Sequence, residues 1–173
     1  MASDDISTHR KKVREFMARA PFHRTSLSED DLSLYCSALT HDSYCSEALN
    51  LPEPRVLQSY ERLEFLGDAI LEFIACEHVY RSTILEEGRM TDFKQDIVAN
   101  RKISERVLSH GLDIDSVMLV GHGHRDGKRN IVEENMRADS FEALIGATYL
   151  LCGMDEARRI VTEVLIPCDF SDH

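Results

Sequence analysis

The chain has 173 residues, 43% of them hydrophobic, which is enough for one domain with a real core. It has no apolar run of about 18 residues and no N-terminal stretch typical of a signal peptide, so we expect neither a membrane span nor secretion. Its five cysteines, an odd number without a C-x-x-C pair, are typical of the reduced thiols of a cytoplasmic protein.

The net charge of −11 argues against nucleic acid as a partner, because surfaces that bind phosphate are usually basic. The charge is unevenly distributed, however. Residues 1–24 hold six basic and three acidic side chains, a net of +3, so the remainder carries −14. Binding of a nucleic acid would therefore require local basic patches, together with divalent cations that offset the carboxylates.

Residues 1–25 are predicted to form a basic N-terminal helical extension. Its apolar side chains lie loosely on one face: Ile6, Val13, Phe16 and Met17. We interpret it as an ordinary solvated helix rather than a dedicated RNA contact. After a break at Pro21, Ser28 and the three acids that follow it predict the start of another helix. Two prolines, at 52 and 54, predict a loop over residues 45–57.

The next predicted helix, over residues 57–81, carries Glu61, Glu64 and Asp68 on one face. At about 100° per residue, these three carboxylates lie within roughly 60° of one another. Apolar side chains fill the rest of the circumference, which predicts a helix surrounded by protein. Carboxylates in such a place repel each other and lose hydration, so we expect a cation between them. Glu72 extends the acidic stripe, and we interpret it as a surface position near the helix end.

Two shorter helices are expected next, from Thr91 towards Asn100 and from Ser104 to Gly111. A last helix is expected to start at Asp155 and end before Pro167. No stretch alternates strictly between apolar and polar side chains for long enough to indicate a sheet. The sequence therefore predicts an all-α domain.

Between these helices, the segment GHGHRDGKR is predicted to be a mobile basic loop. Because it directly precedes a second acidic helix, Arg125, Lys128 and Arg129 are candidates for contacts with the phosphates of a nucleic acid. His122 and His124 could instead form a metal pair, but two histidines without further partners at ligand spacing make a weak site.

The second acidic helix, residues 138–152, has only two charged side chains, Asp139 and Glu142, three residues apart on one face. Gly146 continues that face and would let another helix approach closely. If the two acidic helices pack together, four carboxylates converge into an all-oxygen site that suits Mg²⁺ or Mn²⁺ (Glu64, Asp68, Asp139 and Glu142). The alternative is that each acidic pair is an ordinary solvated helix face.

Three segments carry a resemblance to a known family. YERLEFLGDAIL (residues 60–71) resembles the signature of the ribonuclease III family of double-strand-specific endonucleases. ALTHDSY (residues 38–44) and DSFEALIGA (residues 139–147) are similar to two further blocks of that family, in the same order. The resemblance extends over about residues 30–155, and a long match with two supporting blocks is far more specific than a lone motif.

The resemblance implies a Mg²⁺-dependent endoribonuclease that cleaves double-stranded RNA in RNA processing or decay and leaves 5′-phosphate and 3′-hydroxyl ends. Mn²⁺ is expected to substitute. It implies that Glu142 binds the catalytic metal most directly, with Glu64 and Asp139 as further ligands. Asp68 is expected to be a ligand or to orient water. Glu61 matches a family position close to the RNA or the dimer seam.

The resemblance also implies a symmetric homodimer, because one site per chain cuts only one strand of a duplex. Phe65 occupies the position whose aromatic side chain inserts into the partner subunit in similar proteins; ordinary core packing is the alternative.

The nuclease domain is expected over residues 26–168 and a short tail over 169–173. Many relatives carry a double-stranded-RNA-binding domain after the nuclease domain, and we expect none here. The chain is then either a piece of a longer protein or a stand-alone nuclease, which leaves open a separate RNA-binding partner.

Two other functions compete with this one. A double-stranded-RNA-binding or structural protein on the same fold would lack catalysis, yet it would gain nothing from mutually repelling buried carboxylates. An HD-type metal phosphohydrolase would use the adjacent pair His41 and Asp42, with His78 and His110 as further ligands. With such a site, the acids of the two apolar helices would have no role in binding the metal.

Overall fold

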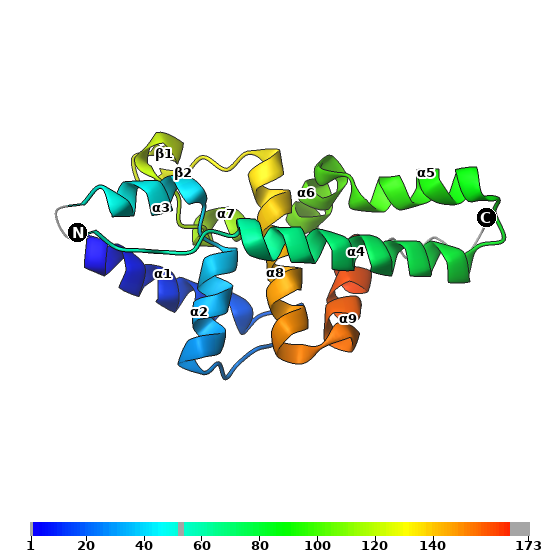
Figure 1. Ribbon diagram of the computed structural model, residues 1–173, viewed down its shortest axis with the longest axis horizontal. Coiled ribbons are helices and arrows are strands. Elements are labelled where there is room, and N and C mark those ends of the chain that lie inside the picture. The colour runs from blue at the N-terminus through cyan, green and yellow to red at the C-terminus, as the bar shows by residue number, and fades with distance from the viewer. Residues whose placement is uncertain (1, 52–53, 167–173) are drawn as a thin grey trace.

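The computed structural model describes residues 2–51 and 54–166, so the expected tail and the expected helix stop at Pro167 lie outside the described residues. The regular secondary structure of the described part is almost entirely helical (Figure 1). The α-helices are α1 (Ala2–Met17), α2 (Glu29–Ala38), α3 (Asp42–Leu49), α4 (Glu61–Ser82), α5 (Glu87–Val98), α6 (Asn100–Ser109), α7 (Ile114–Val117), α8 (Glu134–Cys152) and α9 (Met154–Leu165). The predicted all-α class is confirmed. None of the described helices has both the length and the apolarity needed to cross a bilayer.

The predicted basic loop between residues 120 and 130 is more ordered than expected. It contains a turn of 3₁₀ helix, η1 (His122–His124), followed by strands β1 (Arg125–Asp126) and β2 (Arg129–Asn130). The strands pair in antiparallel fashion around Gly127, whose φ of 58° suits glycine. Similarly, the loop expected over residues 45–57 begins later than predicted, because α3 continues to Leu49.

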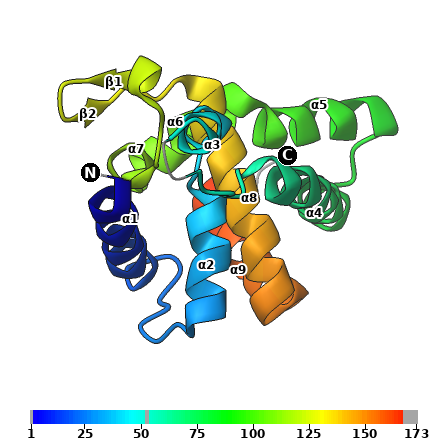
Figure 2. The same cartoon turned by 60° about the vertical axis from the view of Figure 1, so that its left-hand side comes forward.

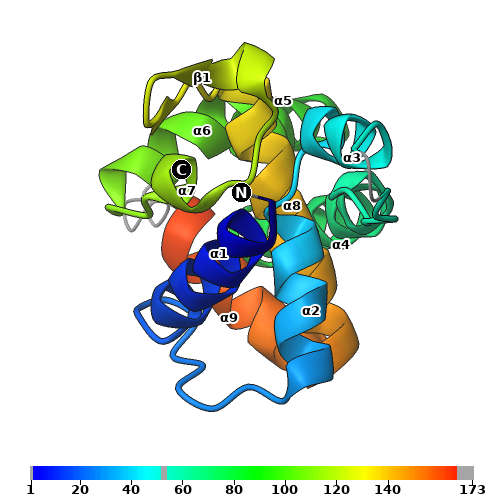
Figure 3. The ribbon, with the colours of Figure 1, turned by 90° about the vertical axis from the view of Figure 1, so that its left-hand side faces the viewer.

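Helix α8 is the centre of the fold. From Ala138 onwards its only charged residues are Asp139 and Glu142, and nearly every residue between Met136 and Thr148 is buried. Helices α2, α4, α6 and α9 pack against it, and Figures 1 and 3 show α8 running between them. A helix that is apolar on all sides is stable only when protein covers it all round. This expectation holds for α8.

Helix α4 was also expected to be covered by protein on all sides, and within this chain that expectation was wrong. The Phe65 side chain is 82% exposed and that of Tyr80 is 73% exposed, so one side of α4 is open. Helix α4 is covered by α8 and α5 on its other sides, and its C-terminal half forms an arm with α5 that extends to the right in Figure 1. Lys94 of α5 donates a hydrogen bond to Glu72 of α4 (2.8 Å), which fastens the arm.

Helix α1 contributes to the common core. Val13, Phe16 and Met17, on its predicted apolar face, are buried. His9 is buried between α2 and α7, with its ring nitrogens 3.0 Å from the Val117 carbonyl oxygen and 3.4 Å from that of Cys36. Figure 2 shows α1 on the side of the molecule opposite α5, with α2 between them.

Candidate metal centre

Two glycines bring α4 and α8 into backbone contact. A Cβ atom on Gly67 of α4 would lie 1.8 Å from the carbonyl oxygen of Glu142, and one on Gly146 of α8 would lie 2.4 Å from that of Leu63. Neither position accepts any side chain without a shift of the helices. The close approach expected at Gly146 is confirmed. Gly67, its counterpart, was not predicted, although a glycine inside an otherwise strong helical pattern was the available signal.

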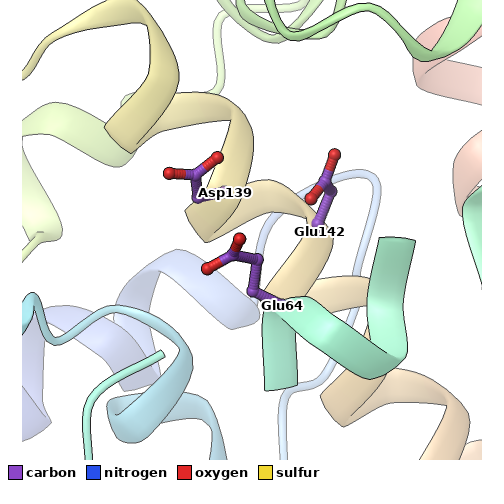
Figure 4. A group of neighbouring side chains, drawn as sticks. All are labelled: Glu64, Asp139 and Glu142. Carbon is purple, nitrogen blue, oxygen red and sulfur yellow. The ribbon is translucent and has the colours of Figure 1, made fainter. Parts of the chain in front are cut away.

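This crossing gathers three carboxylates. One oxygen each of Glu64, Asp139 and Glu142 lies within 4.8 Å of the others, with Glu64 on α4 and the other two one turn apart on α8 (Figure 4). Ligand oxygens on opposite sides of a Mg²⁺ ion are about 4.2 Å apart, since each stands about 2.1 Å from it. The oxygens of the three carboxylates thus lie within a few tenths of an ångström of this separation or closer.

Burial and mutual repulsion make this cluster electrostatically unfavourable without a cation. Burial, followed by the charges of Asp68, Asp139 and Glu64, raises the pKa of the Glu142 carboxyl from 4.5 to about 8. Burial also raises the pKa of Glu64, with Asp139 as the next contributor, and that of Asp139 itself. Among the described residues, no basic side chain forms an ion pair with any of the three. The cluster thus favours a bound cation over three free charges.

Asp68, the fourth predicted acid, lies at the edge of the cluster. It is exposed, one turn beyond Glu64 on α4, and it is not among the three carboxylates whose oxygens lie within 4.8 Å of one another. Its charge still contributes to the raised pKa of Glu142. The structure therefore places Asp68 near the three carboxylates, on their solvent side.

The other predicted site residues lie around this cluster. Glu61 is exposed in the first turn of α4, where Ser59 donates a hydrogen bond to it (2.9 Å). Phe65 lies on the open side of α4. On the hairpin, Lys128 and Arg129 are exposed and Arg125 is half-buried.

A run of aromatic rings extends from η1, just before the hairpin, to the acidic cluster. The rings of His124 and His41 are 5.0 Å apart and those of His41 and Tyr60 are 5.6 Å apart. Burial raises the pKa of Tyr60, and the charges of Asp139 and Glu64 are the next contributors, which places this ring beside the cluster.

The histidines do not form the alternative metal sites considered from the sequence. Among the described residues, the one group of three or more potential ligands that converge consists of the three carboxylates and contains no histidine. His41 hydrogen-bonds to Ser43 (2.7 Å), and His122 pairs with Glu47 (2.7 Å). The expected ligand His110 is exposed at the end of α6.

The model of the Ribonuclease-III-like family matches residues 31–168. The chain belongs to this family. The resemblance noted in the sequence is confirmed, and the matched segment includes every residue of the acidic cluster.

Individual relatives agree with this assignment. The chain is 33% identical over 146 residues to Ribonuclease 3 of Onion yellows phytoplasma, a match that covers 84% of this chain and 58% of the relative. It is 37% identical over 115 residues to Ribonuclease 3 of Homo sapiens, covering 66% of this chain and 8% of that one. The chain thus spans about half the length of the bacterial relatives that it matches, from 46% to 58%.

A solved structure supports the fold. The nuclease domain of ribonuclease III from Campylobacter jejuni, described as flexible in a region involved in dimer formation, superposes with a TM-score of 0.68 at 23% identity. The match covers 90% of this chain and 94% of that one. At this level of identity, the likeness shows a shared fold.

Proposed function

We propose that this chain is a Mg²⁺-dependent endoribonuclease that cleaves double-stranded RNA to 5′-phosphate and 3′-hydroxyl ends. The observation that carries the proposal is the convergence of Glu64, Asp139 and Glu142 at the α4–α8 crossing of a ribonuclease III family member. Free thiols at the four described cysteines fit a reducing compartment, which favours the cytoplasm.

The three converging carboxylates fit a hard divalent cation. All donors are oxygens, the centre is half-buried, and burial disfavours three free charges there. Bound Mg²⁺, or Mn²⁺ in its place, supplies the positive charge that activates water and stabilises the leaving oxygen in phosphodiester hydrolysis. Glu142, the most buried of the three, would hold the ion together with Glu64 and Asp139. Asp68, on the solvent side, would bind or orient the attacking water.

The open side of α4 favours a symmetric homodimer. Phe65, Phe73 and Tyr80 are 82%, 52% and 73% exposed, and they recur at helical spacing along this face. A stripe of exposed aromatics is typical of a protein interface. Two chains that meet here would present two acidic clusters to one duplex, one for each strand.

The hairpin formed by β1 and β2 supplies a basic surface in a chain whose net charge is −11. Arg125, Lys128 and Arg129 would contact RNA phosphates, while Glu61 would lie close to the RNA or the dimer seam. The proposal leaves room for a separate protein that contributes further RNA affinity.

The test uses a labelled RNA duplex and the matching single strand, in Mg²⁺ or EDTA. We expect the wild-type chain to cleave only the duplex and only with Mg²⁺, and Glu142→Gln to abolish cleavage. Arg89→Gln, an exposed change on α5, is the control and should cleave normally. Duplex binding at low salt with no cleavage under any condition would contradict the enzymatic proposal and favour a non-catalytic RNA-binding protein.

A further inference from the structure

Asn100 lies where two helices meet at a sharp corner. Helix α5 ends at Val98, Ala99 is extended (φ −64°, ψ 132°), and α6 begins at Asn100. The corner is held on both sides by the fully buried side chains of Ile97 and Ile103. Asn100 is half-buried, and its side chain is directed at α8.

The Asn100 amide bridges two oxygens on α8. Its Nδ2 atom donates to Oδ1 of Asp139 (3.3 Å) and lies 3.4 Å from Oδ1 of Asn135, one helical turn earlier. A carboxylate only accepts hydrogen bonds, so the amide nitrogen must face Asp139. Within residues 2–51 and 54–166, no other side chain donates a hydrogen bond to a carboxylate of the acidic cluster.

The packing of α6 on α8 does not depend on this contact. One turn further along α6, Ser104 accepts a hydrogen bond from Nη1 of Arg137 (2.7 Å), and both residues are buried. Arg137 also donates to both carboxylate oxygens of Asp115 (2.7 and 2.6 Å). This buried network fixes how the two helices lie against each other. The half-buried amide of Asn100 therefore acts on the Asp139 carboxylate rather than on the fold.

We propose that Asn100 is a positioning residue for the metal centre. By donating to Oδ1 of Asp139, its amide fixes the rotation of that carboxylate relative to the oxygens of Glu64 and Glu142. Groups that orient metal ligands in this way typically change metal affinity by 10- to 100-fold when removed. The inference rests on the proposed function, because it requires that the acidic cluster hold a divalent cation.

The test measures Mn²⁺ binding to the whole chain, by calorimetry and by the electron paramagnetic resonance signal of free Mn²⁺. We expect Asn100→Ala to weaken binding about tenfold, the lower end of that range, because the hydrogen bond is long. Asn100→Leu keeps the side-chain volume without a donor and should give the same loss. Asn135→Ala removes the other acceptor and should change the affinity less than twofold. Urea unfolding in EDTA should be nearly unchanged in all three variants.

The possible failures are distinguishable. Wild-type Mn²⁺ affinity in both Asn100 variants, or an equal loss in Asn135→Ala, would overturn the positioning role while leaving the metal centre intact. Failure of the wild type to bind Mn²⁺, or binding that Glu142→Gln does not weaken, would overturn the proposed metal centre and this inference with it.

Discussion

Replacement of Glu142 by Gln is expected to stabilise the metal-free domain while abolishing metal binding. In the folded chain, burial and neighbouring carboxylates raise the pKa of Glu142 from 4.5 to about 8, so folding favours the protonated form. Below pH 4.5 the carboxyl is protonated in both the folded and the unfolded state and has no effect on stability. As the pH rises from 4.5 to 8, the unfolded state ionises freely and the folded state resists, so stability is lost.

The size of this effect follows from the pKa shift. Each pH unit between 4.5 and 7.5 costs about 1.4 kcal/mol, which gives an upper limit of about 4 kcal/mol at pH 7.5. A glutamine amide is also a buried polar group, and its burial offsets about 1 to 2 kcal/mol of the gain. We therefore expect Glu142→Gln to be more stable than the wild type by about 2 to 3 kcal/mol at pH 7.5, or roughly 5–10 °C in Tm.

The assay is urea unfolding in EDTA at pH 5.0 and 7.5, followed by circular dichroism. The variant should be more stable than the wild type at pH 7.5 and equal to it or slightly less stable at pH 5.0, where the wild-type carboxyl is mostly protonated when folded, and Mg²⁺ should stabilise the wild type only. Glu15→Gln, which removes an exposed carboxylate of α1, is the control and should be neutral at both pH values. Equal stability of wild type and Glu142→Gln at pH 7.5 would refute the reasoning, because it would mean that this carboxylate carries no burial cost.

Three further variants test the architecture. Gly67→Ala forces the α4 and α8 backbones apart; we expect a loss of about 3 kcal/mol in urea unfolding and weaker Mn²⁺ binding. Arg137→Met leaves the Asp115 carboxylate without its partner and should cost about 3 kcal/mol in the same assay. Phe65→Glu changes an exposed position, so we expect a normal fold but a dimer Kd raised by about 100-fold, measured by light scattering over a dilution series.

Each of these variants has a matched control. Gly88→Ala adds a methyl group to α5 where no atom lies within 4 Å, so it should not destabilise the chain. Arg89→Met removes an exposed arginine and should leave stability unchanged. Leu108→Glu introduces the same charge as Phe65→Glu on α6, at a side chain that is 52% exposed, and should leave the dimer intact. Controls that behave like their test variants would remove the structural explanation in each case.

The acidic cluster could be predicted because its signals are local. Each acidic pair lies three or four residues apart on one helix, and the rest of α8 is apolar, so the face and the burial follow from helical periodicity. Gly146 then indicated the side on which another helix would approach. The all-α class followed from the absence of strand periodicity.

The features that were missed depend on contacts between distant segments. Tyr80 on the open side of α4 was missed, and the outward position of Phe65 was expected only from the family resemblance, because in the sequence an interface aromatic has the same pattern as a core aromatic. The contact between Asn100 and Asp139 joins residues 39 positions apart and leaves no periodic signal. The short hairpin at Gly127 has only two residues per strand, too few for an alternation to appear.

One short segment of α4 determines the metal centre and the open face together. Glu64, Phe65 and Gly67 are almost consecutive, yet at about 100° per residue Phe65 points 100° away from Glu64, while Gly67 lies within about 60° of it. Gly67 therefore sets how deeply α4 seats on α8, and so how close Glu64 comes to Asp139 and Glu142. Because a helix turn is rigid, the same seating fixes the direction in which Phe65 faces a partner chain. A substitution at Gly67 should thus disturb metal binding and dimerisation together, whereas Phe65→Glu should disturb dimerisation alone.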